Sequence, residues 1–460
     1  MASATVNAGA RLDRLPVSKF HWRVLGLIAG GMFLDAFEIY LAGGVLGALV
    51  KSGWSDLARN AQFISMTFAG MVVGAWLAGV LGDRYGRRFS YQANLLIFGL
   101  ASFAAAAAPS MTWLIAARFV MGLGLGAEIV VGYVTMTEFV PPRQRAKWGA
   151  GLSALTNTAL FISSFAGFLI IPTAGWRWMF VIVGVGALFV WYLRKAMPES
   201  PRWLESRGRT VEAEAVMRDI ETEVARSGAI LPVAEASTSA PAPERSFTAL
   251  FSKQLITRTI VGSVMLVALN TVIYGFVAWV PTFLVKQGMS VVSSLGFTTL
   301  MSLGGPVGAL IGMWLGDRIG RKRGIIAFSV LAMLLGILYP YSSDPIFLSS
   351  VGFGLVTVLY ILVAFTFALY VPELFPTEVR MRGAGFCNTI GRMMTIVTPY
   401  MVVAIFGAYG IGGVIALMVA FLAVATLVVA VLGIETKQKP LEAIAPSPAA
   451  NVSAGTFKVA

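Results

Sequence analysis

Charged side chains interrupt several long apolar stretches of this 460-residue chain. Asp35 and Glu38 lie in the first stretch, Arg118 and Glu128 in the fourth, and Arg392 in the eleventh. A charge at the centre of an apolar helix costs roughly 2.5–3.5 kcal/mol on insertion scales, so such a residue usually faces a polar cavity and has a function there. These five side chains are the first candidates for proton and ligand chemistry.

Asp35 and Glu38 are three residues apart, so they share one face of a helix. Two close carboxylates in a low-dielectric environment do not both stay ionised easily, which suits at least one of them to carry a proton. Glu38 lies nearer the outer end of its stretch, where solvent could hydrate it instead. Glu128 is open to two roles, a second proton site or a ligand for a bound molecule.

Arg392 follows Asn388 by one helical turn, so both side chains project to one side and could contact a bound molecule. The alternative is a structural pairing of Arg392 with Glu128 or Asp35. Aromatic rings and amides within the apolar stretches could bind a planar ring, or could pack and bridge helices. These further candidates are Tyr133, Asn157, Asn270, Tyr274, Trp279, Tyr360 and Phe365.

The composition shows which elements must position these residues. Hydrophobic residues make up 57% of the chain and charged residues 12%, whereas soluble domains carry about 25% charge. A single cysteine, Cys387, excludes a disulfide scaffold. We therefore expect an all-α integral membrane protein. Twelve stretches are close to the length that spans a bilayer, namely 24–49, 62–82, 91–108, 111–136, 149–171, 177–196, 259–285, 295–316, 325–341, 346–371, 385–407 and 410–434.

The net charge of +13 would suggest a nucleic-acid partner in a soluble protein. The positions of the charges favour another explanation. With the N-terminus in the cytoplasm, 29 of the 35 Lys and Arg residues fall in cytoplasmic loops and tails. This asymmetry follows the positive-inside rule. It predicts two cytoplasmic termini and no nucleic-acid partner.

Three motifs occur twice in the same order, which indicates a duplication. Asp83 and Asp317, in Gly-Asp-Arg-x-Gly-Arg loops, are 234 residues apart, Glu138 and Glu373 are 235 apart, and Glu199 and Glu435 are 236 apart. We therefore expect two six-helix halves. The predicted segments are an N-terminal tail 1–23, a first half 24–196, a loop 197–258 with a short charged helix at 211–226 and a flexible linker at 227–245, a second half 259–434 and a tail 435–460.

The duplicated loops combine carboxylates with arginines that can bind them in a bidentate way. Such pairs could latch the cytoplasmic side in one state and break in another, as alternating access requires. The alternative is a fixed surface ion pair of little energetic value. The candidates for this gate are Asp83, Arg84, Arg87, Arg88, Glu138, Arg145, Glu199, Asp317, Arg318, Arg321, Glu373, Arg380 and Glu435.

These motifs resemble the major facilitator superfamily over essentially all twelve predicted spans. The resemblance rests on the two Gly-Asp-Arg-x-Gly-Arg loops, on Pro-Glu-Ser-Pro-Arg-Trp-Leu at 198–204 and on Pro-Glu-Leu-Phe-Pro-Thr-Glu at 372–378. Within that superfamily the chain is most similar to a sugar-porter-like branch that includes niacin transporters, aromatic-acid/proton symporters and organic-ion transporters. Three sequence segments support that placement, namely Gly-Leu-Gly-Ala-Glu at 124–128, Thr-Glu-Phe-Val at 137–140 and Tyr-Gly-Phe-Val-Ala-Trp-Val-Pro-Thr-Phe-Leu at 274–284.

The resemblance implies roles for three of the charges. Proton-coupled sugar porters pair a span-one Asp with a span-four Arg, and Asp35 and Arg118 match those positions. Protonation of Asp35 would then release Arg118 and permit the transition between states, unless the pair is permanently ionised. In the organic-ion transporters, a basic residue at the position of Arg392 goes with anionic substrates, so Arg392 points to a carboxylate.

We therefore expect a proton-coupled transporter of a small organic anion, with nicotinate as the leading substrate. Hydroxylated benzoates are the alternative, followed by sugars, organic cations or a non-transporting receptor of the same fold. No metal cluster, nucleophile–base set or P-loop lysine points to an enzyme, a cofactor or a metal. Three closely spaced glycines near residue 124 lie in an apolar span and predict close helix packing. A monomer is expected, because two halves suffice to enclose one pathway. The short polar tails suggest a bacterial inner membrane.

Overall fold

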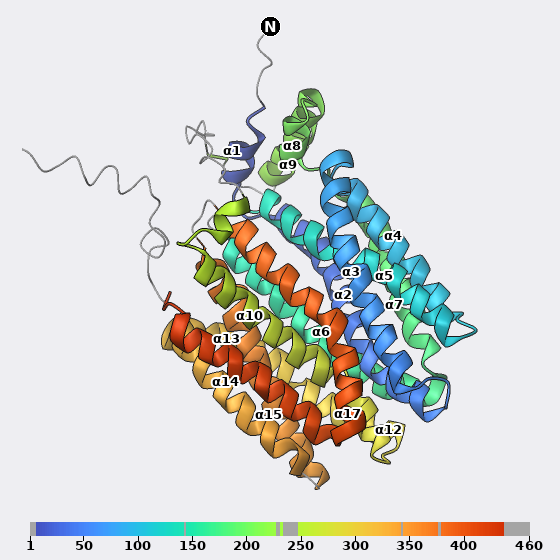
Figure 1. Ribbon diagram of the computed structural model, residues 1–460. Coiled ribbons are helices and arrows are strands. Elements are labelled where there is room, and N and C mark those ends of the chain that lie inside the picture. Colours follow the sequence, from blue (N-terminus) through green and yellow to red (C-terminus); the bar gives the residue numbers. More distant parts are fainter. Residues whose placement is uncertain are drawn as a thin grey trace, which may run out of the picture. The chain divides into compact units, whose positions relative to one another are not determined.

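The computed structural model describes residues 6–141, 144–226, 231–232, 247–341, 344–375 and 379–436 (Figure 1). Within these ranges all regular structure is helical, which confirms the predicted fold class. The chain divides into two compact units, residues 1–240 and 241–460, and each is considered by itself. Most of the predicted linker at 227–245 and of the predicted tail at 435–460 lies outside the described residues.

The first unit contains six long helices, preceded and followed by short ones. Its elements are α1 (Ala8–Asp13), α2 (Lys19–Lys51), α3 (Leu57–Tyr85), α4 (Arg87–Ala106), α5 (Met111–Phe139), α6 (Arg145–Ala174), α7 (Arg177–Leu193), η2 (Arg194–Ala196), α8 (Pro201–Ser206) and α9 (Thr210–Arg226). The predicted charged helix at 211–226 corresponds to α9 and is confirmed.

The second unit repeats this pattern with more interruptions. Its elements are η3 (Phe247–Phe251), α10 (Ile256–Val272), η4 (Ile273–Val277), α11 (Val280–Lys286), α12 (Val291–Ser302), α13 (Gly304–Ile319), α14 (Arg321–Leu338), η5 (Tyr339–Tyr341), α15 (Pro345–Val363), η6 (Ala364–Tyr370), α16 (Val371–Glu373) and α17 (Arg380–Leu432).

Eleven helices in the described residues are long and apolar enough to cross a membrane. The last of them, α17, has 53 residues, and Gly410 inside it has non-helical dihedral angles of φ 62° and ψ −158°. A positive φ of this kind suits glycine, because glycine has no Cβ to clash with the backbone. α17 is therefore two helices that meet at a kink, which accounts for the predicted spans 385–407 and 410–434.

Glycines allow α3 and α5 to pack backbone against backbone. A Cβ added to Gly122 would lie 2.3 Å from the Thr67 carbonyl oxygen, and one added to Gly126 would lie 1.9 Å from that of Met71. Gly124 meets α4 in the same way, 2.8 Å from the Asn94 carbonyl oxygen. The predicted role of these glycines in close helix packing is confirmed.

Two segments of the second unit are wound as π-helices, η4 and η6. Short π-helical segments within α-helices occur often at functional sites. Tyr274 lies in η4, and Phe365 lies in η6.

Part of the predicted N-terminal tail is folded against α8 and α9 (Figure 1). Arg11 and Arg14 each form a salt bridge of 2.7 Å to the Glu221 carboxylate. The backbone N–H groups of Asn7 and Ala8 donate to the Glu205 carboxylate at 2.8 and 2.9 Å. α1 is therefore held on the α8–α9 pair by charge-assisted hydrogen bonds.

Candidate functional site

One face of α2 carries three residues of the candidate site. Gly31, Asp35 and Glu38 follow one another at intervals of four and three residues, so they form a single stripe along the helix. The Asp35 and Glu38 side chains are both buried, with residue exposures of 1% and 0%. The sequence left open that solvent hydrates Glu38 at the outer end of its helix. Its burial in the structure argues against that alternative.

The first ion pair of the site joins Glu38 to Arg118 on α5. Arg118 also donates from Nε to Thr67 Oγ1 at 2.9 Å, and its guanidinium lies 4.5 Å from the centre of the Phe63 ring. The structure thus pairs Arg118 with Glu38, whereas the sequence analysis expects Asp35. Both carboxylates are on the same stripe one turn apart, and the register of α2 against α5 selects the second.

A second buried ion pair joins Glu128 on α5 to Arg194 on η2. Arg194 Nη1 donates to Glu128 Oε2 at 2.9 Å, and Nη2 donates to Oε1, so the contact is bidentate. The side chains are 0% and 2% exposed, for Arg194 and Glu128 respectively. The sequence patterns do not single out Arg194, which lies at the end of the predicted span 177–196. The available signal was Glu128 itself, because a carboxylate buried in a span needs a cation nearby.

These five residues, Asp35, Glu38, Arg118, Glu128 and Arg194, form what we call the charge cluster. Ten residues separate Arg118 from Glu128 along α5, or about 15 Å at 1.5 Å per residue. Asp35 lies on α2 between Gly31, which faces the second pair, and Glu38 of the first pair. The cluster holds three carboxyl groups and two guanidinium groups. Full ionisation would leave one excess negative charge in a buried environment, and one bound proton would remove it.

The first duplicated loop forms a compact set of hydrogen bonds between α4, α5 and the segment after η2. Arg87 donates from Nε to Glu138 Oε1 at 3.0 Å and forms a 3.0 Å salt bridge to Asp83. The Glu199 carboxylate accepts from the backbone N–H of Arg87 at 2.9 Å. Burial raises the pKa of the Glu199 carboxyl group overall. The backbone hydrogen bonds from Ser200, Arg87 and Arg88 act in the opposite direction but do not outweigh it. We call Asp83, Arg87, Glu138 and Glu199 the first loop cluster.

The second duplicated loop repeats this geometry. Arg321 binds both oxygens of Glu373 at 3.0 Å, and its backbone N–H donates to Glu435 Oε1 at 2.8 Å. Gly320 precedes Arg321 with φ 97°, as Gly86 precedes Arg87 with φ 100°. The second loop cluster, Arg321, Glu373 and Glu435, therefore matches the first in residue type and in contacts.

The remaining gate candidates have separate neighbours. Arg84 lies 5.4 Å from the centre of the Tyr85 ring, and Arg318 lies 3.9 Å from that of Trp314. Arg88 donates to the Lys195 carbonyl at 3.0 Å, Arg145 forms a 3.0 Å salt bridge to Asp13, and Arg380 donates to the Phe375 carbonyl at 3.4 Å. The side chain of Asp317 lies outside the described residues.

In the second unit, Arg392 lies on α17 where that helix packs against α10. A Cβ on Gly391 would lie 2.7 Å from Asn270 Nδ2, so Asn270 faces the turn that carries Arg392. Tyr274 is one turn beyond Asn270 and interacts electrostatically with Arg392. The Asn388 Oδ1 atom is buried and has no hydrogen-bond partner within the described part of the chain. Arg392 is half-buried, and no carboxylate of the described residues forms a salt bridge with it.

The other candidates differ in burial. Trp279, Tyr360 and Phe365 are at most 1% exposed. Trp279 stacks on Phe283 at 5.9 Å between ring centres, and Phe365 lies 5.7 Å from Phe328. These contacts favour the packing alternative for Trp279 and Phe365, and burial alone favours it for Tyr360. Tyr133 and Asn157 in the first unit are half-buried.

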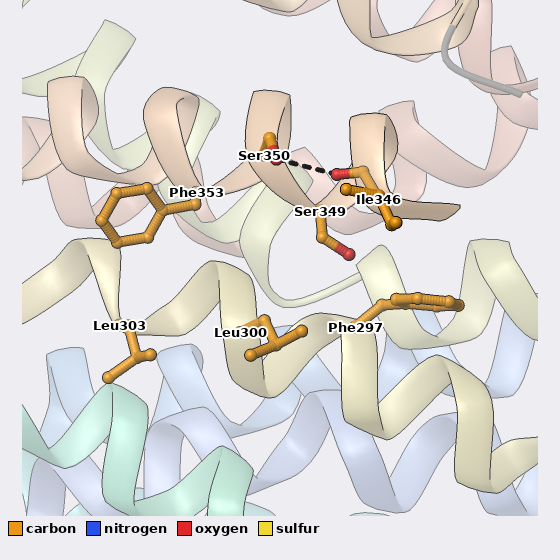
Figure 2. A pocket seen from close by; sticks show the side chains of 7 residues that line it. All are labelled: Phe297, Leu300, Leu303, Ile346, Ser349, Ser350 and Phe353. Carbon is orange, nitrogen blue, oxygen red and sulfur yellow. Dashed lines mark hydrogen bonds between the residues drawn. The ribbon is translucent and has the colours of Figure 1, made fainter. Parts of the chain in front are cut away.

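A cavity of about 440 Å³ lies between α12 and α15, and no charged side chain is among the residues that line it (Figure 2). Ser349 and Ser350 supply its polar side chains, and Ser350 Oγ donates to the Ile346 carbonyl at 2.8 Å. None of the predicted substrate residues lines it. Its wall is formed by Phe297, Leu300, Leu303, Ile346, Ser349, Ser350 and Phe353.

The duplicated helical units, the matched loop clusters and the buried charges define a multi-pass membrane transporter of the major facilitator type. A family described as "Sugar (and other) transporter" matches residues 55–447, and the chain belongs to this family. It is therefore a transporter and not an enzyme.

Individual proteins are similar over almost the whole chain. "Inner membrane metabolite transport protein YdjE" from Escherichia coli is 37% identical, covering 95% of this chain and 98% of its own. "Niacin transporter NiaP" from Acinetobacter baylyi is 31% identical, covering 95% and 99%. Among solved structures, a D-xylose-proton symporter superposes with a TM-score of 0.71 at 17% identity, covering 91% of this chain and 99% of the other. The last comparison supports the fold alone.

Proposed function

We propose that this transporter carries a small organic anion together with a proton, and that the anion is an aromatic carboxylate such as nicotinate. The observation that carries the proposal is the composition of the charge cluster. Three carboxyl groups are buried with two guanidinium groups, so the cluster changes from one excess negative charge to neutrality when it binds a single proton.

The anion preference rests on Arg392. Its guanidinium is half-buried in the second unit and has no carboxylate partner among the described residues, unlike Arg118 and Arg194. A guanidinium binds a carboxylate in a planar, bidentate way. Asn388 and Asn270 lie beside it and could hydrogen-bond a ring substituent or a ring nitrogen. The similarity to a protein named as a niacin transporter favours nicotinate over other carboxylates.

The two loop clusters are proposed to act as latches. Each holds the end of one span to the ends of its neighbours through Arg87–Glu138 or Arg321–Glu373. These contacts can form in one transport state and break in another, which is how alternating access uses ion pairs at span ends. We further propose that both termini are cytoplasmic, that the membrane is a bacterial inner membrane and that a monomer suffices.

Uptake of radiolabelled nicotinate into proteoliposomes tests the proposal, with and without an inward proton gradient. We expect wild-type uptake to be stimulated by the gradient, Asp35→Asn to lose the stimulation, and Arg392→Ala to lose uptake. Unlabelled 4-hydroxybenzoate, xylose and choline serve as competitors. Absence of protein-dependent nicotinate uptake, with uptake of labelled 4-hydroxybenzoate in its place, would replace the substrate. Uptake indifferent to the gradient would remove the proton.

A further inference from the structure

Arg194 connects three long helices of the first unit to the end of α7, whereas the proposed proton chemistry uses only its charge. Its Nε donates to the Leu27 carbonyl of α2 at 2.8 Å, and Nη2 donates to the Ile28 carbonyl at 3.1 Å. The other hydrogen bonds go to the Glu128 carboxylate on α5. The guanidinium also lies 4.7 Å from the centre of the Tyr91 ring on α4.

Gly31 on α2 makes this arrangement possible. A Cβ at this position would lie 2.2 Å from Arg194 Nη2 and 2.4 Å from Glu128 Oε1. Any side chain at residue 31 would therefore displace both members of the ion pair. Gly31 precedes Asp35 by one helical turn on the same stripe, so Arg194 holds α2 immediately beside a candidate proton site.

The pairing places a compensating charge directly on the Glu128 carboxylate. A buried carboxylate that receives two hydrogen bonds from a guanidinium is stabilised as the anion. The buried titratable and charged groups on the elements packed around Glu128 include His21, Asp35 and Glu38 on α2, Tyr91 on α4, Arg118 on α5 and Arg194 on η2. Only Arg194 binds Glu128 in a bidentate way among these groups.

We infer that Arg194 is a positioning residue for the proton site: it compensates the charge of the Glu128 carboxylate and fixes the turn of α2 before Asp35. The transported proton then binds at Asp35 or Glu38 and not at Glu128. This inference rests on the proposed function. It gives Glu128 neither of the two roles that the sequence leaves open, a second proton site or a ligand for the bound molecule, but that of the partner of Arg194.

Exchange of labelled for unlabelled nicotinate across proteoliposomes, measured as a function of pH, tests the inference without a gradient. In Arg194→Gln, the buried Glu128 carboxylate loses the cation that compensates its charge. We expect the midpoint of the pH profile to rise by about one unit or more. The double variant Glu128→Gln/Arg194→Gln removes both charges of the pair, and we expect its midpoint to return to the wild-type value.

Thermal unfolding in detergent at pH 7.5 and pH 5.5 is a second test, and it needs no substrate. Breaking a buried pair costs more than replacing both partners. We therefore expect Arg194→Gln to have a lower Tm than the double variant at pH 7.5, and this gap to narrow at pH 5.5. The surface variant Arg218→Gln, whose parent side chain is 75% exposed, is the matched control and should show neither effect.

A structural role alone would lower the Tm of Arg194→Gln equally at both pH values and leave the exchange midpoint unchanged, and that result would overturn the inference. An equal exchange midpoint in the single and double variants would overturn it as well. If wild-type exchange shows no pH dependence, the proposed proton coupling fails. The unfolding measurement then still decides whether Arg194 compensates the Glu128 carboxylate, because it needs no transport.

Discussion

The Glu38 carboxylate and the Arg118 guanidinium form a salt bridge whose side chains are only 0% and 2% exposed. Arg118 is oriented further by its hydrogen bond to Thr67 Oγ1 and by the Phe63 ring. A buried pair of this kind makes a large difference to stability when one partner is removed, because the other charge is left uncompensated.

Glu38→Gln should therefore destabilise the protein, by about 3–5 kcal/mol in the free energy of unfolding. Asp35→Asn should cost much less, because it leaves the Glu38–Arg118 pair in place. Thermal unfolding of the purified variants in detergent measures both. A larger loss in Asp35→Asn than in Glu38→Gln would show that Arg118 depends on Asp35 after all.

Gly86→Ala tests the geometry of the first loop cluster. Gly86 has φ 100° and ψ 169°, a conformation that only glycine adopts readily, and a Cβ there would lie 2.2 Å from Glu199 Oε2. We expect a loss of about 1–3 kcal/mol in the free energy of unfolding. Gly79→Ala is the matched control, since a Cβ at residue 79 meets nothing within 4 Å. Equal Tm values for the two variants would contradict the proposed constraint at residue 86.

The second loop cluster should matter for transport and not only for stability. Arg321→Gln removes the bidentate contact with Glu373, so the proposed latch can no longer form. We expect the initial rate of nicotinate uptake to fall about tenfold, the effect of about 1.4 kcal/mol on a transport barrier. Arg323→Gln, at an exposed position two residues further on, should stay within about twofold of wild type. A tenfold loss in both variants would show a general effect of charge in this loop.

The attachment of α1 should depend on pH through Glu221. Burial raises the pKa of this carboxyl group, but hydrogen bonds and charge interactions with Arg11 and Arg14 outweigh it and lower the pKa overall. The contribution of Glu221 to stability is therefore complete above its unfolded-state pKa of about 4.3 and is lost as the pH falls through the lower folded-state value.

Hydrogen exchange at residues 6–14, corrected for the intrinsic effect of pH on exchange, measures this attachment. We expect strong protection at pH 7 and a loss of protection below about pH 4. Glu221→Gln should show weak protection at both pH values. Protection that is the same in the variant and in the wild type would mean that contacts other than those of Glu221, such as the hydrogen bonds to Glu205, hold α1 in place.

The span pattern and the duplicated loops could be predicted from the sequence because they depend on local information. Apolar length alone places the spans, and the positions of Asp83, Glu138 and Glu199 recur at nearly constant spacing in the second half. The residue types in these loops also predict their contacts, since Arg87 and Arg321 do bind Glu138 and Glu373.

The partners inside the charge cluster could not be predicted in the same way. Asp35 and Glu38 are on one stripe of α2, and the choice between them depends on how far α2 is shifted along α5. Arg194 lies at the end of an apolar span, where a long side chain can extend to the surface or fold back inside. Its orientation depends on the space left by Gly31 and on the position of Glu128, which only the packed structure shows.

The most direct test of the central claim measures the proton itself. Proteoliposomes that contain a pH-sensitive dye receive an outside-to-inside gradient of nicotinate at equal pH on both sides, with protein-free liposomes as the control for passive permeation of nicotinic acid. We expect the lumen to acidify as labelled nicotinate enters, and Asp35→Asn to abolish the protein-dependent acidification. Entry of labelled nicotinate through the wild-type protein with no acidification beyond that of the protein-free liposomes would contradict proton-coupled transport.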